Sequence, residues 1–228
     1  MALILNIDTA TEIASVAICA HQNVLAFCTN NVQNEHASFL QPAIEKMLVE
    51  HNISLHNLDA IAVTNGPGSY TGLRVGLASA KGLSFALQKP LITVNTLEAM
   101  AVASINENND SDVLHCPMID ARRMEVYTAV YDCNIEAKML PNAMILENDN
   151  FKNLLKINKI IFSGSGALKA QQVIQHHNAI FSKTLYSAIS CNTISQKKFS
   201  QKSFDNVAYA TPNYLKEFYT TAKIIKQN

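Results

Sequence analysis

Short apolar runs separated by tight polar turns dominate the first hundred residues of the chain. Five of these runs have the length and composition of strands: residues 3–7, 14–20, 24–28, 59–64 and 91–95. The first three follow one another through short turns and predict a β-meander, whereas longer segments precede the last two. The pattern therefore predicts a sheet that begins as a meander and continues as an α/β unit, in the order βββαβα, with the fifth strand after the second helix.

The two longer segments have helical spacing. In residues 35–50, the apolar side chains of Leu40, Ile44 and Met47 recur on one face of a helix. Residues 71–87 are apolar nearly all round, and a helix of that kind is not a normal surface helix. Small residues recur in this second helix at every fourth position: Gly72, Gly76, Ala80 and Ser84.

These small residues need a physical reason, because each helical glycine costs about 0.5–1 kcal/mol relative to alanine. Close approach to another helix supplies one. The charged side chains of this helix, Arg74 and Lys81, share one strip. We therefore expect one face to pack on the chain's own sheet and another on a second protein. The alternative is a helix buried wholly inside its own domain.

The second half of the chain is less regular. A polar stretch at residues 104–112 marks the best lobe boundary. Apolar runs beyond it predict strands of a second lobe: residues 113–119, 126–131 and 160–162. We predict an N-terminal lobe of residues 1–103 and a smaller lobe of residues 104–228. A terminal helix at about residues 206–220, interrupted by Pro212, is expected to pack back on the first lobe.

Composition excludes several classes of protein. The chain is 48% hydrophobic and 16% charged with a formal net charge of zero, which fits a globular protein without a polycationic surface. Residues 1–150 nevertheless carry 16 acidic and 7 basic residues, and residues 151–228 carry 2 and 11. Solvated surface lysines and a tRNA-binding lobe both remain open. The five widely spaced cysteines argue against a disulfide framework and a zinc site.

The N-terminal sequence does not resemble a secretory signal, and no apolar stretch reaches the roughly 18 residues of a membrane span. The cytoplasm is therefore the expected compartment, with no membrane partner.

Glycines are concentrated where the fourth strand enters the second helix, since five of the seven lie within residues 66–82. Backbone N–H groups at such a joint can hold a phosphate or carboxylate. The spacing fits neither a Walker loop nor a Rossmann loop, so a tight turn with a helix cap is the alternative. The residues of this candidate nucleotide loop are Asp8, Asn65, Gly66, Gly68, Ser69 and Thr71. Asp8 alternatively holds its own turn through short hydrogen bonds.

A third feature is the segment MIDARRMEVY, which contains two of the three arginines of the chain. Arg122 and Arg123 follow Asp120 closely, and an arginine can hold a carboxylate or phosphate through two hydrogen bonds. Alternatively, Asp120 and an arginine pair with each other and fix the turn between two strands.

Several segments together resemble the TsaB family, in family order: LILNIDTATEIASVAI, NEHASFLQPAIEKML, VTNGPGSYTGLRVGLASAKGL, VNTLEAMA, MIDARRMEVYTAVY and TPNYLK. The first of them resembles the opening hairpin of the actin, Hsp70 and sugar-kinase superfamily. The resemblance implies an α/β, ribonuclease H-like fold of two lobes with a reduced second lobe.

The resemblance also implies partners. TsaB pairs with the catalytic subunit TsaD, which transfers a threonylcarbamoyl group to the adenosine beside the anticodon of tRNAs reading ANN codons. The ATPase TsaE joins the pair. On this hypothesis the chain is a non-catalytic scaffold that meets tRNA through the complex and forms a homodimer when alone. The expected interface residues are His36, Leu40, Ile44, Met47, Gly72, Arg74, Gly76, Ala80 and Lys81.

The catalytic metal of TsaD is held by a histidine pair in a segment similar to residues 94–100. Thr96 and Met100 stand at the corresponding positions here, and a hydroxyl and a thioether are poor ligands for such an ion. The resemblance therefore implies no metal site and no required cofactor, with ATP possible at the interface of the complex. The rival hypotheses are an independent ATP-dependent transferase or kinase, a peptidase, and a tRNA-binding module in the basic second half.

Overall fold

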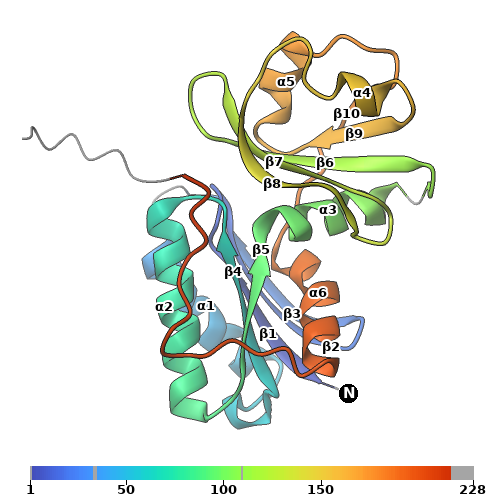
Figure 1. Cartoon of the computed structure of the whole chain (residues 1–228). Coiled ribbons are helices and arrows are strands. Elements are labelled where there is room, and N and C mark those ends of the chain that lie inside the picture. Colours follow the sequence, from blue (N-terminus) through green and yellow to red (C-terminus); the bar gives the residue numbers. More distant parts are fainter. Residues whose placement is uncertain (1, 33–34, 109, 217–228) are drawn as a thin grey trace, which may run out of the picture.

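The computed structural model of the chain describes residues 2–32, 35–108 and 110–216. The chain folds into two lobes, each built around a five-stranded sheet (Figure 1). The first lobe holds most of the N-terminal half, and the second lobe is formed by residues between 113 and 181.

The sheet of the first lobe follows the predicted order closely. Its strands are β1 (Leu3–Asp8), β2 (Ala14–Ala20), β3 (Asn23–Asn30), β4 (Ala60–Gly66) and β5 (Leu91–Asn95). They lie in the order β3-β2-β1-β4-β5. The first three form an antiparallel meander, and β4 and β5 run parallel to β1. The carboxyl ends of β1 and β4 therefore meet at one edge, where the loops that follow them lie together.

Helices cover both faces of this sheet (Figure 1). Helices α1 (His36–Glu50) and α2 (Tyr70–Leu87) lie on one face, over the side chains of Leu5 and Ile7. Helices α3 (Thr96–Glu107) and α6 (Ala188–Ser200) lie on the other face, over the side chain of Ile4. A sheet buried on both faces explains why its strands are apolar at nearly every position. A short 3-10 turn, Leu55–Asn57, precedes β4.

The second lobe repeats the strand order of the first. Its elements are β6 (Val113–Asp120), β7 (Glu125–Tyr131), β8 (Ala137–Ile145), α4 (Lys152–Leu155), β9 (Lys159–Ser163), α5 (Ala167–Val173) and β10 (Ala179–Phe181). Read from its other edge, the order β8-β7-β6-β9-β10 matches β3-β2-β1-β4-β5, again with three antiparallel strands followed by parallel ones. The helices of this lobe are much shorter. The predicted actin-like fold with a reduced second lobe is confirmed.

Two helices and one segment differ from the sequence-based expectation. Helix α3 includes the first residues of the polar stretch at 104–112, and α6 was not predicted. The terminal helix expected at about residues 206–220 is wrong for residues 206–216, which form turns and extended backbone because Pro212 and hydrogen bonds to the first lobe hold them open. The rest of that prediction lies outside the described residues.

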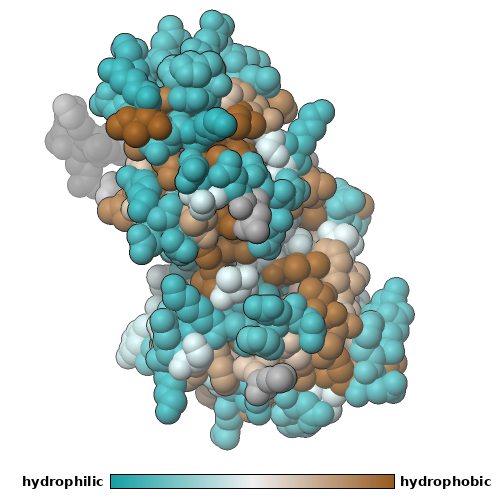
Figure 2. All heavy atoms as spheres, turned by 90° about the vertical axis from the view of Figure 1, so that its right-hand side faces the viewer, coloured by the Kyte–Doolittle hydropathy of each residue, from teal (hydrophilic) through white to brown (hydrophobic). Residues whose placement is uncertain are grey.

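The two lobes meet across an apolar waist. Helix α3 packs on both sheets, and Leu97, Met100 and Ala101 from it join Ile119 and Tyr131 of the second lobe in one buried cluster. Figure 2 shows hydrophobic atoms gathered at this waist, below a largely hydrophilic second lobe. Among the described residues, no helix combines the length and apolar character that crossing a membrane requires.

Candidate functional site

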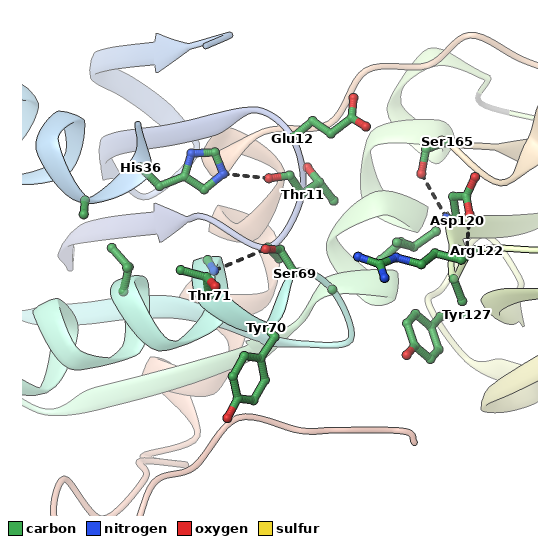
Figure 3. Close-up of a pocket in the computed structure, with 17 residues that line it drawn as sticks. Thr11, Glu12, His36, Ser69, Tyr70, Thr71, Asp120, Arg122, Tyr127 and Ser165 are labelled. Atoms are coloured by element: carbon green, nitrogen blue, oxygen red, sulfur yellow. Dashed lines mark hydrogen bonds between the residues drawn. The ribbon is translucent and has the colours of Figure 1, made fainter. Parts of the chain in front are cut away.

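A cavity of about 670 Å³ lies between the lobes, where the loops after β1, β4 and β6 converge. Figure 3 shows its lining, which comes from both lobes. The polar and aromatic side chains around it include Thr11, His36, Ser69, Thr71, Arg122 and Tyr127. The convergence follows from the shared topology of the two sheets, because each lobe directs the carboxyl end of its first strand toward the same space.

The glycine-rich loop forms one wall of this cavity, and the packing within the chain accounts for its glycines. A Cβ on Gly68 would lie 2.2 Å from the carbonyl oxygen of Ala10, and one on Gly72 would lie 2.0 Å from that of Thr9. A Cβ on Gly66 would lie 2.5 Å from the carbonyl oxygen of Asn213. These distances are shorter than any van der Waals contact, so each glycine is required by a neighbouring backbone.

The loop also caps the helix that follows it. The Ser69 hydroxyl accepts a hydrogen bond from the Gly72 N–H at 3.3 Å, and the Ser69 N–H donates to the Ala10 carbonyl at 2.7 Å. Asn65 accepts a hydrogen bond at its carbonyl oxygen from the Asn213 N–H, at 2.6 Å. Thr71 is exposed and lines the cavity. The tight turn with a helix cap, one of the two interpretations of the sequence, thus describes this geometry.

Asp8 is turned into the protein and does not line the cavity. Its Oδ1 accepts hydrogen bonds from the Thr64 hydroxyl at 2.7 Å, the Ala10 N–H at 3.1 Å and the Tyr186 hydroxyl at 3.3 Å. Burial raises the pKa of this carboxyl above its ordinary value, although the three hydrogen bonds work in the opposite direction. Asp8 therefore fixes the turn after β1 and ties it to Tyr186, in the segment that returns from the second lobe.

The hairpin between β6 and β7 forms the opposite wall. The Asp120 Oδ1 accepts hydrogen bonds from the Arg122 N–H at 2.6 Å and from the Lys169 ammonium at 2.5 Å. Burial works to raise the pKa of Asp120, but Lys169 and the Arg122 N–H outweigh it and hold the pKa below its ordinary value. The side-chain partner of Asp120 is thus a lysine of α5 and not an arginine, which corrects the pairing considered from the sequence.

The two arginines of this hairpin have left-handed backbone conformations, with φ of 68° at Arg122 and 48° at Arg123. Bulky residues rarely adopt this region, and the Lys169 ammonium helps to hold it by donating to the Arg123 carbonyl at 2.5 Å. The Arg122 side chain extends toward the cavity and the start of α2 (Figure 3). A guanidinium and a helix N-terminus on opposite walls both favour an anionic group.

The residues expected to contact a partner are mostly interior. Seven of the nine are buried by the chain's own packing: His36, Leu40, Ile44, Met47, Gly72, Gly76 and Ala80. Their side chains therefore pack mainly within the chain, and their place in a partner interface stays a prediction. Helical periodicity identifies the buried stripe of a helix but does not tell whether its own sheet or a partner buries it.

Arg74 and Lys81, the other two expected interface residues, lie on a flank of α2 that residues 205–216 cover. We call these residues the strap (Figure 1). The Lys81 ammonium donates to the carbonyls of Ala208 and Ala210, each at 3.1 Å, and Arg74 Nε donates to the Tyr214 hydroxyl at 3.1 Å. The sequence predicted that residues at about 206–220 pack back on the first lobe, but as a helix. The contacts of the strap were not predicted, because these hydrogen bonds join residues more than a hundred positions apart.

Thr96 and Met100 lie in the waist between the lobes. Both are buried, and a Cβ on Gly164 would lie 2.3 Å from the Met100 Cε, so that the thioether fills the space against the second lobe. Within the described ranges, no three His, Cys, Asp or Glu side chains are grouped so that they could hold a metal ion.

The basic second half of the sequence does not form one basic lobe. Lys197, Lys198 and Lys202 lie in or just after α6, which packs on the first lobe. Residues 113–186 carry eight basic and six acidic residues. Several of these lysines also have acidic partners, as Lys169 does with Asp120 and Lys152 with Asp149.

Comparison with known proteins agrees with this geometry. The family model described as "TsaD: tRNA N6-adenosine threonylcarbamoyltransferase" matches residues 21–226. The tRNA threonylcarbamoyladenosine biosynthesis protein TsaB of Buchnera aphidicola subsp. Baizongia pistaciae is 31% identical over 206 residues, which are 86% of this chain and 92% of that protein. TsaB of Escherichia coli K12 is 40% identical over 128 residues, 56% of this chain and 54% of that protein.

A solved structure extends the match to the whole fold. A Pseudomonas aeruginosa protein, described as similar to the peptidase YeaZ, superposes with a TM-score of 0.85 at 26% identity, covering 95% of this chain and 100% of that one. The sequence matches span both lobes, and the structural match includes nearly every described element. This chain belongs to the TsaB family.

Proposed function

We propose that this chain acts in the biosynthesis of threonylcarbamoyladenosine in tRNA as a non-catalytic scaffold that forms a heterodimer with TsaD. The names of its relatives place TsaB proteins in this biosynthesis. In the proposed complex, TsaD carries the transfer chemistry, TsaE is a further subunit, and tRNA is bound by the assembly. The cytoplasm is the proposed compartment.

The observation that carries the proposal is the outer face of α2, on the side away from the sheet. Ala78, Gly82 and Ala86 are exposed there at every fourth position, and Phe85 is 80% exposed beside them. A Cβ on Gly82 would meet nothing within 4 Å, so the chain itself gives no reason for a glycine. Close approach of a helix from another protein would give one, and small residues in a row permit that approach.

Both cations of α2, Arg74 and Lys81, have partners within the chain. The strap holds the Lys81 ammonium on its backbone carbonyls, and the Arg74 guanidinium lies over the Tyr70 ring at 3.8 Å. A partner helix that lies along Ala78 and Gly82 would therefore leave the Lys81 ammonium bound to the strap. Burial of an uncharged patch that contains an exposed aromatic is the usual source of affinity in protein interfaces.

Gly82→Leu tests this proposal without disturbing the fold, because the added side chain enters open space. The measurement is binding to purified TsaD by size exclusion and calorimetry, with unfolding of each variant as a check. The matched control is Thr193→Leu, which adds a leucine to an exposed position of α6 on the opposite face of the sheet. We expect Gly82→Leu to lower the affinity at least about tenfold and Thr193→Leu to leave it unchanged. Equal binding by both variants would exclude this face of α2.

The same face supports a homodimer in the absence of TsaD, because an exposed apolar patch can pack against the same patch of a second copy. Gly82→Leu should then shift the isolated chain toward the monomer at a given concentration. Omission of the chain from a reconstituted tRNA-modification reaction tests the function itself. Full activity without it would contradict the scaffold role.

A second candidate is an ATP-dependent transferase or kinase, which the cavity between the lobes favours through Arg122 and the start of α2. Asp8 does not take part, because it is buried beneath the loop. Calorimetric titration of the isolated chain with Mg-ATP separates the candidates. Micromolar binding with hydrolysis would support the enzyme. Binding only in the presence of TsaD would place ATP at the interface of the complex.

A further inference from the structure

The strap contacts three parts of the first lobe in succession. It begins at the edge of the sheet, where the Asp205 N–H donates to the Leu91 carbonyl at 2.9 Å and the Asp205 carboxylate accepts from the Thr93 N–H at 2.7 Å. It then crosses α2, whose Lys81 ammonium binds two of its carbonyls. Val207 and Ala210 pack against the core between these points. The strap is therefore held along its length rather than at one end.

Its third contact is the loop that enters the cavity. The Asn213 N–H donates to the Asn65 carbonyl at 2.6 Å, and the Asn213 carbonyl oxygen occupies the space that a Cβ on Gly66 would need. Next to it, the Tyr214 ring lies 5.5 Å from the Tyr70 ring, measured between centroids, and its hydroxyl accepts from Arg74. Gly66 has a φ of 119° and so has two separate reasons to be glycine, its own conformation and the passage of the strap.

The strap ends on the second lobe. The Lys216 ammonium forms an ion pair with Glu125, at the start of β7 and two residues before Tyr127, which lines the cavity. The strap thus runs from the first sheet, past the Tyr70 side of the cavity, to the opposite wall. Helix α3, on which the second lobe rests, lies on the other side of the molecule (Figure 1).

We propose that the strap is a latch that holds the second lobe against the start of α2 and so sets the width of the cavity. The lobes are joined through α3 on one side, and the latch joins them on the other. Its last anchors include an ion pair, a contact between two tilted aromatic rings and a hydrogen bond near the surface, which are individually weak and reversible. Release of Tyr214 and Lys216 would let the lobes separate on the cavity side while the core contacts of Val207 and Ala210 remain.

Hydrogen exchange of the full chain, read by mass spectrometry, tests the latch. The variants are Tyr214→Ala, which removes the ring that contacts Tyr70, and Glu125→Gln, which removes the charge on the second lobe. The matched control is Glu136→Gln, which removes an exposed carboxylate that pairs with Lys138 in the same sheet. We expect both variants to exchange about tenfold faster in the strap and also in residues 119–123, across the cavity, with α6 unchanged. The control should exchange as the wild type does.

Salt gives an independent reading, because it screens an exposed ion pair. About 1 M salt should speed exchange of residues 119–123 in the wild type and add little in Glu125→Gln. If the strap exchanges faster in the variants while residues 119–123 keep their wild-type rate, the strap only covers α2 and the latch is wrong. Unchanged exchange in both regions would overturn it equally. Faster hydrogen exchange in α6 would show that Tyr214→Ala is unfolded. In that case the exchange rates of Glu125→Gln alone test the latch.

Discussion

Gly76 lies directly over Thr9, so close that a Cβ on the glycine would be 2.3 Å from the threonine hydroxyl oxygen. The same hydroxyl donates a hydrogen bond to the Gly72 carbonyl at 2.7 Å and thereby ties the first turn of α2 to the end of β1. The small-residue ridge of α2 thus serves a contact inside the chain, and its open face carries a separate glycine, Gly82.

This relationship predicts opposite effects of one substitution at two positions of one helix. Gly76→Ala should destabilise the chain by about 1–3 kcal/mol, because the added methyl group overlaps Thr9. Gly82→Ala should stabilise it by about 0.5–1 kcal/mol, because the methyl group meets open space and alanine favours the helix. Chemical unfolding of both variants measures the difference. Similar effects at the two positions would mean that α2 does not pack on Thr9 as described.

The buried carboxyl of Asp8 predicts a contrast between two replacements. Asp8→Ala leaves the donors of Thr64, Ala10 and Tyr186 without an acceptor and should cost at least about 2 kcal/mol. Asp8→Asn keeps an oxygen for them and removes the buried charge, so its cost should be within about 1 kcal/mol.

The pH dependence of the Asp8→Asn variant follows from the raised pKa of Asp8. Ionisation of a carboxyl with a raised pKa disfavours the folded state, so the wild type loses stability as the pH rises above the unfolded value of 3.8. The stability of Asp8→Asn relative to wild type should therefore increase as the pH rises above about 4. Urea unfolding at several pH values measures this difference. A relative stability that falls with pH would contradict the assignment.

The strands and first two helices of the first lobe were predictable, because each has an apolar pattern of the right period. Helices α3 and α6 were not. Helix α3 is buried between two sheets and so lacks a polar stripe. Helix α6 buries polar residues: the Ser195 hydroxyl donates to Asn6 Oδ1 at 2.7 Å, and Asn192 Nδ2 donates to the His21 carbonyl at 2.6 Å. Buried but hydrogen-bonded side chains of this kind remove the periodic signal.

The candidate site was predictable in its segments but not in its contacts. The glycine loop and the Asp120 hairpin face one cavity. The sequence singled out both segments, one by its concentration of glycines and the other by its two arginines. The sequence could not show that Gly66 makes room for Asn213, or that Lys169 is the partner of Asp120. The repeated topology of the second lobe was also hidden, because two sheets can share a strand order without sharing residues.

His115 predicts a loss of stability in acid. Its Nδ1 lies 2.8 Å from the Ser104 hydroxyl oxygen, and its Nε2 has no hydrogen-bond partner among the described residues. Burial lowers the pKa of this imidazole from 6.5, so the unfolded chain takes up the proton first. The stability that His115 contributes in its neutral form is therefore present above about pH 6.5 and is lost as the pH falls toward the folded value.

Urea unfolding of wild type and His115→Gln between about pH 5 and pH 8 measures this contribution. The variant cannot titrate at this position, so its stability should fall less steeply in acid. His56→Gln is the control, since His56 is exposed on the surface of the first lobe. Parallel pH profiles for wild type and His115→Gln would show that His115 is hydrated in solution.

Lys81 predicts how firmly the strap lies on α2. Its ammonium donates to the carbonyls on either side of Tyr209, which is itself 81% exposed. Lys81→Ala should weaken the closed strap by about 1 kcal/mol, the scale of a hydrogen-bonded charge near the surface, and so raise the open population about fivefold. Chymotrypsin, which cuts after aromatic residues, should then cleave the native chain after Tyr209 about fivefold faster.

The control for this measurement is Lys46→Ala, which removes an exposed lysine from α1 and its ion pair with Glu50. Cleavage after Tyr209 is followed by the mass of the released C-terminal fragment, under conditions in which the rest of the chain stays folded. Equal cleavage rates in the two variants would show that Val207 and Ala210 hold the strap by apolar packing alone. A faster rate in Lys81→Ala would show that Lys81 holds the strap on this flank of α2. This flank would then be occupied by the strap, and the exposed face with Gly82 would remain for TsaD.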